Sequence, residues 1–575
     1  MVEVPLWGIL MRHLAIDKMQ TTIKTETKMK YLNKSLLFLA CASFLTVGCS
    51  NDDDEPIVNP EPPVVDLDSY VCPAYDDNYV SVSAWDARKQ WNLANVHDPS
   101  VVKAADGYYY MYQTDASYGN AHQSDLRNSG KHGHFFCRRS KDLVNWEFMG
   151  RTMVGLPSWI KPKLNEIRKQ MGLEERPDSY FANDLDFGYW APCVRKVSDN
   201  LYRMYYCITC PGTIDGAGTW SERAFIGLME TSDPASNKWE DKGFVITNAS
   251  DKGLEYRVSQ TDYNNCYFKY NAIDPSYIIT PEGQHWLIYG SWHSGFAAVE
   301  LDATTGKTKA ELPKPFGTAE EIAPYGKTIF TRDKTSRWQG SEAPEVVYHD
   351  GYYYLFVAYD ALDVPYNTRV LRSKNVDGPY ETMDGAVTDA ATGAGNNPTV
   401  LTHPYKFGEG YGWVGISHCA VFDDGEGNWY YASQQRMPDG VPGIASSNAI
   451  MMGGVRSIKW MSNGWPAVMP ERYGAVPQET IAESELAGTW EHIDLSYSYG
   501  KQRTATEMVL GEDHTVTKGT WAGASWSYDA NTGTLTVGQQ ELKVQREVDW
   551  EASPRKVTIV YTGLNGSKSY WGKKK

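Results

Sequence analysis

HDPSVVKAADGYYYMYQTD, residues 97–115, is the stretch of sequence that decides the fold. A short apolar run leads into an Asp106-Gly107 turn, and an aromatic run follows it. This pattern is typical of a β-hairpin. An acidic residue, Asp98, stands where the first run begins. The stretch therefore predicts two antiparallel strands with a carboxylate at the start of the first.

The same unit recurs four more times along the chain. The other copies are WAPCVRKVSDNLYRMYYCIT from Trp190, IDPSYIITPEGQHWLIYGSW from Ile273, EAPEVVYHDGYYYLFVAYD from Glu342 and SHCAVFDDGEGNWYYASQQ from Ser417. A second strand pair follows each hairpin, so that one unit holds the four strands of a propeller blade. Because such recurrence is the signature of a repeat fold, we predict an all-β chain with a five-bladed β-propeller over residues 71–478.

Residues 479–575 follow a different pattern. Strand alternation with Gly, Asn and Asp turns continues there, but the hairpin unit does not recur. We predict a small C-terminal β-barrel or β-sandwich domain without catalytic residues. Within the propeller region, residues 158–186 form an insertion, in which KPKLNEIRKQMGLEERP predicts a short helix. The closing run, residues 573–575, consists of lysines and is expected to be a solvated tail.

The start of the chain has the features of an export signal. Basic residues after Met29, an apolar run and small residues before Cys49 indicate a signal peptide, so residues 1–49 are a predicted leader that starts at Met29. The segment LTVGC resembles the lipobox of bacterial lipoproteins, which makes Cys49 the predicted lipidation site. Residues 50–70 are acidic and proline-rich and predict a disordered tether. We expect a lipid-anchored protein on the extracellular side of a bacterial envelope, at the outer membrane or cell surface, with a secreted or periplasmic protein as the alternative.

Composition narrows the range of partners. The formal net charge of −16 argues against a nucleic-acid partner. After the leader, no apolar segment reaches the roughly 18–20 residues of a membrane span, so membrane contact is expected only through the lipid.

Of the 9 cysteines, Cys41 and Cys49 fall in the leader, and the odd remainder argues against a disulfide framework. Cys207 and Cys210 lie in a predicted strand without a second matching pair, so we predict buried cysteines rather than a metal or redox site. We expect a monomer.

Aligning the hairpins on their proline, with Ala420 in that place in the fifth, puts distinctive side chains at matching positions. Asp98 and Asp274 stand one residue before it; Trp190, Glu342 and His418 stand two residues before it. Since the first strand of each blade lines the central channel, these side chains are predicted to converge on one axial cleft. Clustered carboxylates raise one another's pKa, so one can stay protonated while another is ionised, as cleavage of a glycosidic bond requires. A single Asp-Pro would be an ordinary turn, and the prediction depends on the repeated register.

Several motifs together resemble glycoside hydrolase family 43 and, within it, the endo-1,5-α-L-arabinanases. They are HDPSVV, WAP, NAIDPS, YGSWHSG, SEAPEVVY and GWPAVMPERYG, spread from about residue 92 to the C-terminal region. The resemblance implies a five-bladed propeller and an inverting mechanism. It implies that Asp98 is the general base, that Glu342 is the general acid, and that Asp274 holds Glu342 and tunes its pKa. Inversion also implies that base and acid are about 6.5 to 9.5 Å apart.

The resemblance implies binding residues as well. His418 matches the position that, together with water, holds a calcium ion on the propeller axis; a channel histidine without metal is the alternative. The implied sugar-binding residues are Gly188, Trp190, Asn271, Ser291, Trp292 and His293. The chain departs from the family pattern at Cys193, where Asp is usual, at Trp292-His293, where Phe-Trp is usual, and at Ser417-His418-Cys419, where GHN is frequent.

The implied activity is hydrolysis of internal α-1,5 bonds in plant cell-wall arabinan or its oligosaccharides. An exo-acting α-L-arabinofuranosidase or β-xylosidase of the same family is one alternative, and the C-terminal domain favours the endo-acting enzyme. A non-catalytic glycan-binding propeller on the cell surface is another, against which the registered acid and base argue. The related fructan enzymes carry NDPNG and RDP motifs, where this chain has HDPSV and IDPSY.

Overall fold

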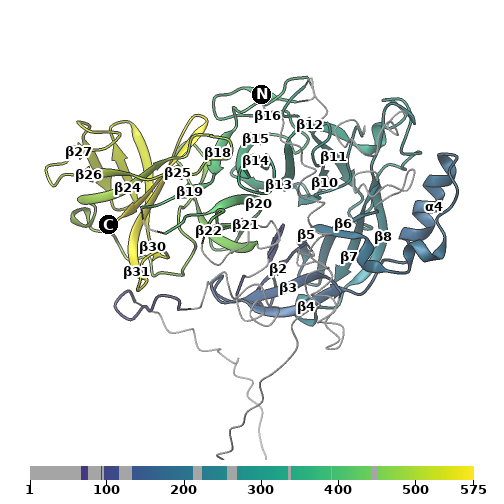
Figure 1. Ribbon diagram of the computed structural model, residues 1–575, viewed down its shortest axis with the longest axis horizontal. Helices are drawn as coiled ribbons and strands as arrows, with labels where there is room; N and C mark the ends of the chain where they lie inside the picture. Colours follow the sequence, from purple (N-terminus) through teal and green to yellow (C-terminus); the bar gives the residue numbers. More distant parts are fainter. Residues whose placement is uncertain are drawn as a thin grey trace, which may run out of the picture. The chain divides into compact units, whose positions relative to one another are not determined.

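The computed structural model describes residues 66–74, 92–93, 96–114, 133–210, 223–254, 268–334, 339–389, 391–408, 410–441 and 451–575. Predictions about the leader, Cys49 and most of the tether fall outside these residues. The strands form a five-bladed propeller and a C-terminal barrel-like sheet (Figure 1). The fold class predicted from the sequence is therefore confirmed.

Each blade is a sheet of antiparallel strands that follow one another in the chain. The first two blades are β1 Ser100–Lys103, β2 Tyr109–Tyr112, β3 His134–Ser140 and β4 Glu147–Met153, then β5 Gly188–Ser198, β6 Leu201–Thr209, β7 Ala224–Thr231 and β8 Glu240–Thr247. The third is β9 Ser276–Ile279, β10 His285–Tyr289, β11 Phe296–Leu301 and β12 Lys327–Phe330. The fourth is β13 Ser341–His349, β14 Tyr352–Tyr359, β15 Asn367–Ser373 and β16 Tyr380–Glu381, with β17 Val387–Thr388 and β18 Thr399–Thr402 added. The fifth is β20 Val414–Asp423, β21 Trp429–Arg436, β22 Met452–Trp460 and β23 Pro466–Val468.

The first strands of the blades close into a ring. Strand β1 contacts β5, β5 contacts β9, β9 contacts β13, β13 contacts β20, and β20 returns to β1. Their apolar runs are buried on both sides, which explains why they read as nearly continuous β-branched and aromatic segments. Because all five strands start at the same end of the channel, the residues just before their apolar runs meet there.

A polar pair inside the channel joins three of the inner strands. Arg195 on β5 and Glu345 on β13 form an ion pair of 2.6 Å between Nη2 and Oε1. Ser276 on β9 donates to Oε2 of Glu345 over 2.9 Å. A buried charge pair with additional hydrogen bonds is satisfied and fixes its neighbours in place. The pair thus holds the inner strands in register below the channel mouth.

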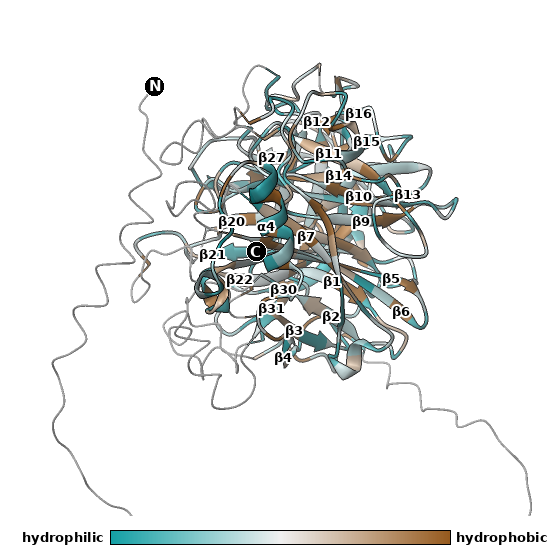
Figure 2. Cartoon of the chain, turned by 90° about the vertical axis from the view of Figure 1, so that its right-hand side faces the viewer, coloured by the Kyte–Doolittle hydropathy of each residue, from teal (hydrophilic) through white to brown (hydrophobic). Residues whose placement is uncertain are grey.

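The predicted helix in the insertion is present as α4, Ile160–Gln170. Its buried residues Ile160, Leu164 and Ile167 recur at the spacing of one helical face and pack against the core of the first two blades. Figure 2 shows the resulting contrast between the teal, polar outer side of α4 and the brown, apolar strands of the propeller.

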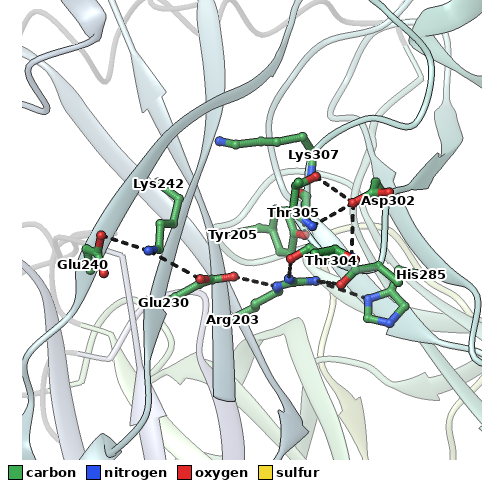
Figure 3. A network of polar contacts seen from close by, with 12 residues as sticks. Arg203, Tyr205, Glu230, Glu240, Lys242, His285, Asp302, Thr304, Thr305 and Lys307 are labelled. Atoms are coloured by element: carbon green, nitrogen blue, oxygen red, sulfur yellow. Dashed lines mark hydrogen bonds and ion pairs between the residues drawn. The ribbon is translucent and has the colours of Figure 1, made fainter. Parts of the chain in front are cut away.

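A buried arginine ties the second blade to the third. Arg203 on β6 is fully buried and pairs through Nε with Glu230 on β7 at 2.8 Å. Its terminal nitrogens donate to the carbonyl oxygens of Ala303 and Thr304, at 2.9 and 2.7 Å, in the turn after β11 (Figure 3). Its terminal nitrogens therefore hold that turn against the neighbouring blade, while Nε is paired within the second blade.

The C-terminal sheet has eight strands in the order β27-β26-β24-β32-β31-β30-β29-β28. They are β24 Gly488–Asp494, β26 Thr506–Leu510, β27 Val516–Lys518, β28 Trp526–Asp529, β29 Thr534–Val537, β30 Gln540–Asp549, β31 Lys556–Asn565 and β32 Lys568–Lys574. An antiparallel bridge between Thr515 and Ser525 brings the two edge strands together. The sheet therefore curls into a barrel-like closure around its own apolar core.

This domain shares a second core with the propeller. Ile493, Leu495 and Trp571 pack in one cluster with apolar residues of the fourth and fifth blades. Strand β19, Tyr405–Lys406, pairs in parallel with β25, Arg503–Thr504. The indole of Trp571 also donates to the carbonyl oxygen of Val468 over 2.7 Å. The two parts are thus joined by buried apolar surface and by backbone pairing.

The prediction of a solvated lysine tail is wrong for Lys573. This side chain is 3% exposed, and its Nζ lies 3.0 Å from Glu471, 2.9 Å from Asp549 and 2.5 Å from Glu551. The reason is that β32 is an interior strand of the barrel, paired with β24 on one side and β31 on the other. Lys573 therefore lies inside the protein, where its positive charge neutralises the three surrounding carboxylates.

The prediction that Cys207 and Cys210 are buried is confirmed. Cys137, Cys193 and Cys419 are buried as well. In the part of the chain that the structure describes, no helix is both long and apolar enough to cross a membrane.

Candidate active site

The mouth of the channel is built from five residues with left-handed backbone. They are Asp98, Ala191, Asp274, Ala343 and His418, one from the start of each inner strand, with φ angles of 43°, 41°, 53°, 56° and 51°. Residues other than glycine seldom adopt positive φ, and such strain gathers at functional sites. The strained turns lie at the starts of the five inner strands, which contact one another in a ring, so five distant segments meet at one place. Residues of all five segments line one cavity.

The structure corrects the alignment of the fifth hairpin. His418 is equivalent to Asp98 and Asp274, because it carries the left-handed conformation, and Cys419 occupies the position of the proline. The pairing of β20 with β21 shifts register between Ser417 and Cys419, as that of β13 with β14 does after Glu342. Placing Ala420 opposite the prolines was therefore wrong by one residue, because the fifth copy has no proline to mark the bulge.

Asp98 is held by two partners from other segments. Its Oδ1 lies 2.8 Å from Nδ1 of His418, and its Oδ2 accepts a hydrogen bond of 2.5 Å from Thr114. The amide of Ala191 donates in turn to the Thr114 hydroxyl oxygen over 2.7 Å. Burial alone would raise the pKa of Asp98, but the facing His418 and these hydrogen bonds lower it to about 2. Asp98 is consequently ionised across the physiological range.

Glu342 receives three hydrogen bonds. The Ser291 hydroxyl and the Trp292 indole donate to Oε2 over 3.0 and 2.7 Å, and the Tyr366 hydroxyl donates to Oε1 over 2.6 Å. Burial raises the pKa of Glu342, and the nearby Asp98 carboxylate adds to the effect. The hydrogen bonds oppose it because they favour the ionised form. The outcome is an oriented carboxyl group that retains its proton more readily than a free glutamate.

Asp274 interacts electrostatically with both Asp98 and Glu342. Its Oδ2 accepts a hydrogen bond of 3.0 Å from the amide of Ala343, next to Glu342 in the chain. Burial raises its pKa to about 8, with repulsion from Glu342 and Asp98 adding to the effect and His418 opposing it. His418 shows the converse: burial would lower its pKa, but Asp98 and Asp274 raise it to about 9. The cluster thus combines one firmly ionised carboxylate with two carboxyl groups that resist ionisation.

The residues implied as sugar-binding differ in their exposure to solvent. Trp190 and Trp292 are partly exposed. Asn271 and His293 are fully buried and Ser291 is 3% exposed. Asn271 donates to the carbonyl oxygen of Ser291 over 3.0 Å, and His293 packs edge-on against Phe268. These three lie behind the surface and support it, while a direct sugar contact remains a prediction for the two tryptophans.

Gly188 has a packing function in this arrangement. A Cβ atom there would clash with the Thr209 hydroxyl and would lie 2.7 Å from the Trp190 ring, which is much closer than atoms approach without a clash. Glycine is therefore needed for the Trp190 indole to fold back over β5. The residue shapes the cleft through its lack of a side chain.

Two supporting residues were not found from the sequence. Tyr366 lies in the connection between β14 and β15, and Thr114 follows β2; both contact the carboxylates across strands rather than along them. Neither residue occupies a position that stands out when the five hairpins are aligned. The one available signal was that each follows the aromatic strand of its hairpin, close to the channel mouth.

Comparison with known proteins agrees with this geometry. The model for glycosyl hydrolases family 43 matches residues 93–466, and that for its C-terminal lipocalin-like domain matches residues 470–572. The chain belongs to glycosyl hydrolase family 43. A relative from this family, the extracellular endo-α-(1→5)-L-arabinanase of Thermotoga petrophila, is 27% identical over 85% of this chain and 95% of its own. The extracellular endo-α-(1→5)-L-arabinanase 2 of Bacillus subtilis is 25% identical over 84% and 93%.

Solved structures show the same family 43 fold. The endo-1,5-α-L-arabinanase of Thermotoga petrophila superposes with a TM-score of 0.61 at 23% identity and covers 84% of this chain and 99% of its own. The family 43 YxiA protein of Bacillus licheniformis gives 0.60 at 22% identity, covering 84% and 98%. Both propeller and barrel are thus shared with solved members of the family.

His418 could contribute one ligand atom to a mostly hydrated cation. Among the described residues, the acidic, histidine or cysteine side chains that could jointly hold an ion are Glu471, Asp549 and Glu551, which surround Lys573, and none of them lies at the channel mouth. At His418, contact of Nδ1 with Asp98 leaves Nε2 as the ligand atom, in the carboxylate–histidine arrangement typical of metal sites. A calcium ion bound there would draw its other ligands from water.

Proposed function

We propose that this family 43 enzyme is an extracellular endo-1,5-α-L-arabinanase that hydrolyses internal α-1,5-L-arabinofuranosidic bonds of arabinan with inversion. The observation that carries the proposal is the division of roles at the channel mouth. The pKa of Asp98 is lowered to about 2, whereas burial raises that of Glu342. One group is available as a base and the other as an acid, which is what inverting hydrolysis requires.

Asp98 has the properties of the general base. Each of its oxygens accepts one hydrogen bond from the protein, from His418 or Thr114, and retains capacity to accept another from water. The two contacts fix the carboxylate plane, so the orientation of an attacking water is set before substrate binds. As the water attacks the anomeric carbon, its proton passes to Asp98.

Glu342 has the properties of the general acid. Ser291, Trp292 and Tyr366 hold the carboxyl group from both oxygens, and Asp274 holds the adjacent backbone at Ala343. Its proton passes to the leaving glycosidic oxygen as the bond breaks, which avoids release of an alkoxide. Asp274 thereby acts through position, while burial and the Asp98 carboxylate favour the protonated form of Glu342.

We propose further that His418 ligates a calcium ion through Nε2. Bound there, the ion would supply positive charge beside the carboxylate cluster. Without an ion, protonation of His418 supplies that charge, since the pKa of its imidazole is raised to about 9. His418 itself keeps Asp98 oriented in either state.

The proposed location is the outer side of a bacterial envelope, with Cys49 as a lipid anchor. The named relatives from Thermotoga petrophila and Bacillus subtilis are extracellular proteins. Expression of the full chain and of Cys49→Ser in a bacterial host with labelled palmitate tests the anchor. Labelled wild-type protein in the membrane fraction, with no label on Cys49→Ser, supports the anchor. Equal labelling of both proteins, or labelling of neither, contradicts it.

Exo-acting hydrolysis is the second candidate, and one observation favours it less. The extracellular exo-α-(1→5)-L-arabinofuranosidase ArbA of Cellvibrio japonicus is 25% identical but matches 65% of this chain, against 85% for the endo-acting relative. Products from linear debranched arabinan distinguish the two. An early ladder of oligosaccharides supports the endo-arabinanase, and arabinose alone from the start supports the exo-acting enzyme. Retained binding without any product would indicate a glycan-binding protein.

A further inference from the structure

A loop of the C-terminal domain reaches the fourth blade of the propeller. Tyr497, three residues after β24, donates from its hydroxyl to Oδ2 of Asp360 over 2.8 Å. The amide of Ser498 donates to Nε2 of His403 over 3.1 Å, and the Arg369 guanidinium lies 4.6 Å from the centre of the Tyr497 ring. The loop is therefore held at several points on the propeller, and Tyr497 is its polar contact with Asp360.

Asp360 connects this loop to the segment that carries Glu342. It is 6% exposed and follows β14 in the left-handed conformation, with φ of 69°. Its amide donates to the carbonyl oxygen of Gly340 over 2.8 Å, and its Oδ1 accepts from Nη1 of Arg332 over 2.8 Å. Arg332 also donates to Gly340, over 2.6 Å. Asp360 thus fixes the backbone two residues before Glu342 both directly and through Arg332.

The backbone beside Gly340 also holds Trp292. The amide of Trp292 donates to the carbonyl oxygen of Ser341 over 2.9 Å, and its own carbonyl oxygen accepts from Gln339 over 2.7 Å. Trp292 has a positive φ of 60°, a conformation that such neighbours must maintain. Because its indole donates to Glu342, displacement of residues 339–341 would move that donor.

A second route runs from Asp360 along the chain. The connection between β14 and β15 begins at Asp360 and contains Tyr366, whose hydroxyl donates to the other oxygen of Glu342. Asn367, the first residue of β15, donates from its side chain to Oδ2 of Asp360 over 3.1 Å. Both ends of this connection are therefore tied to one carboxylate. Trp292 and Tyr366 donate to the two oxygens of Glu342, and the positions of both therefore depend on Asp360.

We propose that Tyr497 of the C-terminal domain is a positioning residue for Glu342, acting through Asp360. This assigns the C-terminal domain a part in the reaction, and it rests on the proposed function. The Tyr497 hydroxyl bonds Asp360, whereas the carboxyl group of Glu342 is held by Ser291, Trp292 and Tyr366, so removal of that hydroxyl should slow the chemical step and leave substrate affinity unchanged.

Kinetics of Tyr497→Phe on debranched arabinan test the proposal, in the full chain and at a temperature where circular dichroism shows every variant to be folded. The ring and its contact with Arg369 remain, and one hydrogen bond is lost. We expect kcat to fall about 10- to 100-fold, the effect of losing one hydrogen bond to a charged group, with KM unchanged. Tyr499→Phe is the matched control, since Tyr499 lies two residues away, is 65% exposed, and should keep the wild-type kcat.

A double-mutant cycle with Asp360→Asn adds a second measurement. If Tyr497 acts through Asp360, the double variant loses little more than the worse single variant, because residues in one network are not additive. Equal kcat values for Tyr497→Phe and Tyr499→Phe would overturn the proposal, as would losses that multiply in the double variant or a change confined to KM. Failure of the wild type to cleave arabinan would instead count against the proposed function.

Discussion

The hydroxyl of Tyr366 donates a hydrogen bond of 2.6 Å to Oε1 of Glu342, although Glu342 lies on β13 and Tyr366 lies in the connection between β14 and β15. Tyr366 is fully buried, so no solvent competes for this contact. The bond has two effects on the carboxyl group. It fixes the direction in which the remaining lone pairs and proton point, and it favours the ionised form.

Tyr366→Phe should therefore change both rate and pH dependence. Loss of orientation should lower kcat about tenfold, less than the roughly 100- to 10,000-fold that general acid catalysis contributes, because the acid is misplaced and not removed. Loss of the hydrogen bond should raise the pKa of Glu342 further above its usual value, so the alkaline limb of kcat should move to higher pH. A pH profile of kcat on debranched arabinan measures both. A variant with wild-type rate and an unmoved limb would contradict the assigned contact.

Glu342→Gln should remove the proton donor while preserving shape. An amide cannot protonate the leaving oxygen, so turnover of arabinan should fall by about 100- to 10,000-fold, the range for general acid catalysis. Binding of arabino-oligosaccharides, measured by calorimetry, should stay near that of the wild type, because Ser291, Trp292 and Tyr366 remain. Near-native turnover would show that another group is the acid.

His418→Ala tests the channel histidine and the proposed ion together. The variant loses the partner that orients Asp98, so kcat should fall at every calcium concentration. In the wild type, a chelator should lower activity and added calcium should restore it, whereas the variant should respond to neither. Wild-type activity that is unchanged in metal-free buffer would favour a channel histidine without metal.

Much of the site could be predicted because proline marks the register of the hairpins. Asp98, Asp274 and Glu342 each precede such a proline by one or two residues, so the repeat alone placed them at one end of the channel. The fifth copy was misaligned because Cys419 replaces the proline. Tyr366 was not predicted, because its contact depends on how a connection folds back over the strand ends. Such contacts leave no periodic trace in a sequence.

The burial of Lys573 could not be predicted from the sequence either. The closing lysines look like an ordinary solvated tail, and only the pairing of β32 between two other strands shows that Lys573 is interior. Strand order in a barrel is set by contacts far apart in sequence. Composition near the C-terminus therefore could not reveal that one of three adjacent lysines is buried.

Lys573→Met should destabilise the protein strongly. The three carboxylates around Nζ would lose their cation in a buried place, which costs about 3–5 kcal/mol for a broken buried ion pair. Lys575→Met, at an exposed position two residues away, is the matched control and should be nearly neutral. Denaturant unfolding at pH 7.5 measures the difference. Equal stability of the two variants would mean that the cluster is neutralised by protonation instead.

His492 should make the C-terminal domain sensitive to acid. It is 1% exposed, and its Nδ1 lies 2.6 Å from the Tyr561 hydroxyl. Burial lowers its pKa from 6.5 to about 4. Below pH 6.5 the unfolded chain takes up a proton that the folded state refuses, so stability is complete above that pH and falls as the pH drops toward 4.

The full loss through this residue is about 3 kcal/mol, because each pKa unit corresponds to about 1.4 kcal/mol. His492→Gln removes the titration and keeps a group that can hydrogen-bond to Tyr561. Unfolding free energies at pH 7.5 and pH 5 should therefore differ less for the variant than for the wild type. If both proteins lose the same stability between these pH values, other groups cause the acid sensitivity and His492 does not contribute to it.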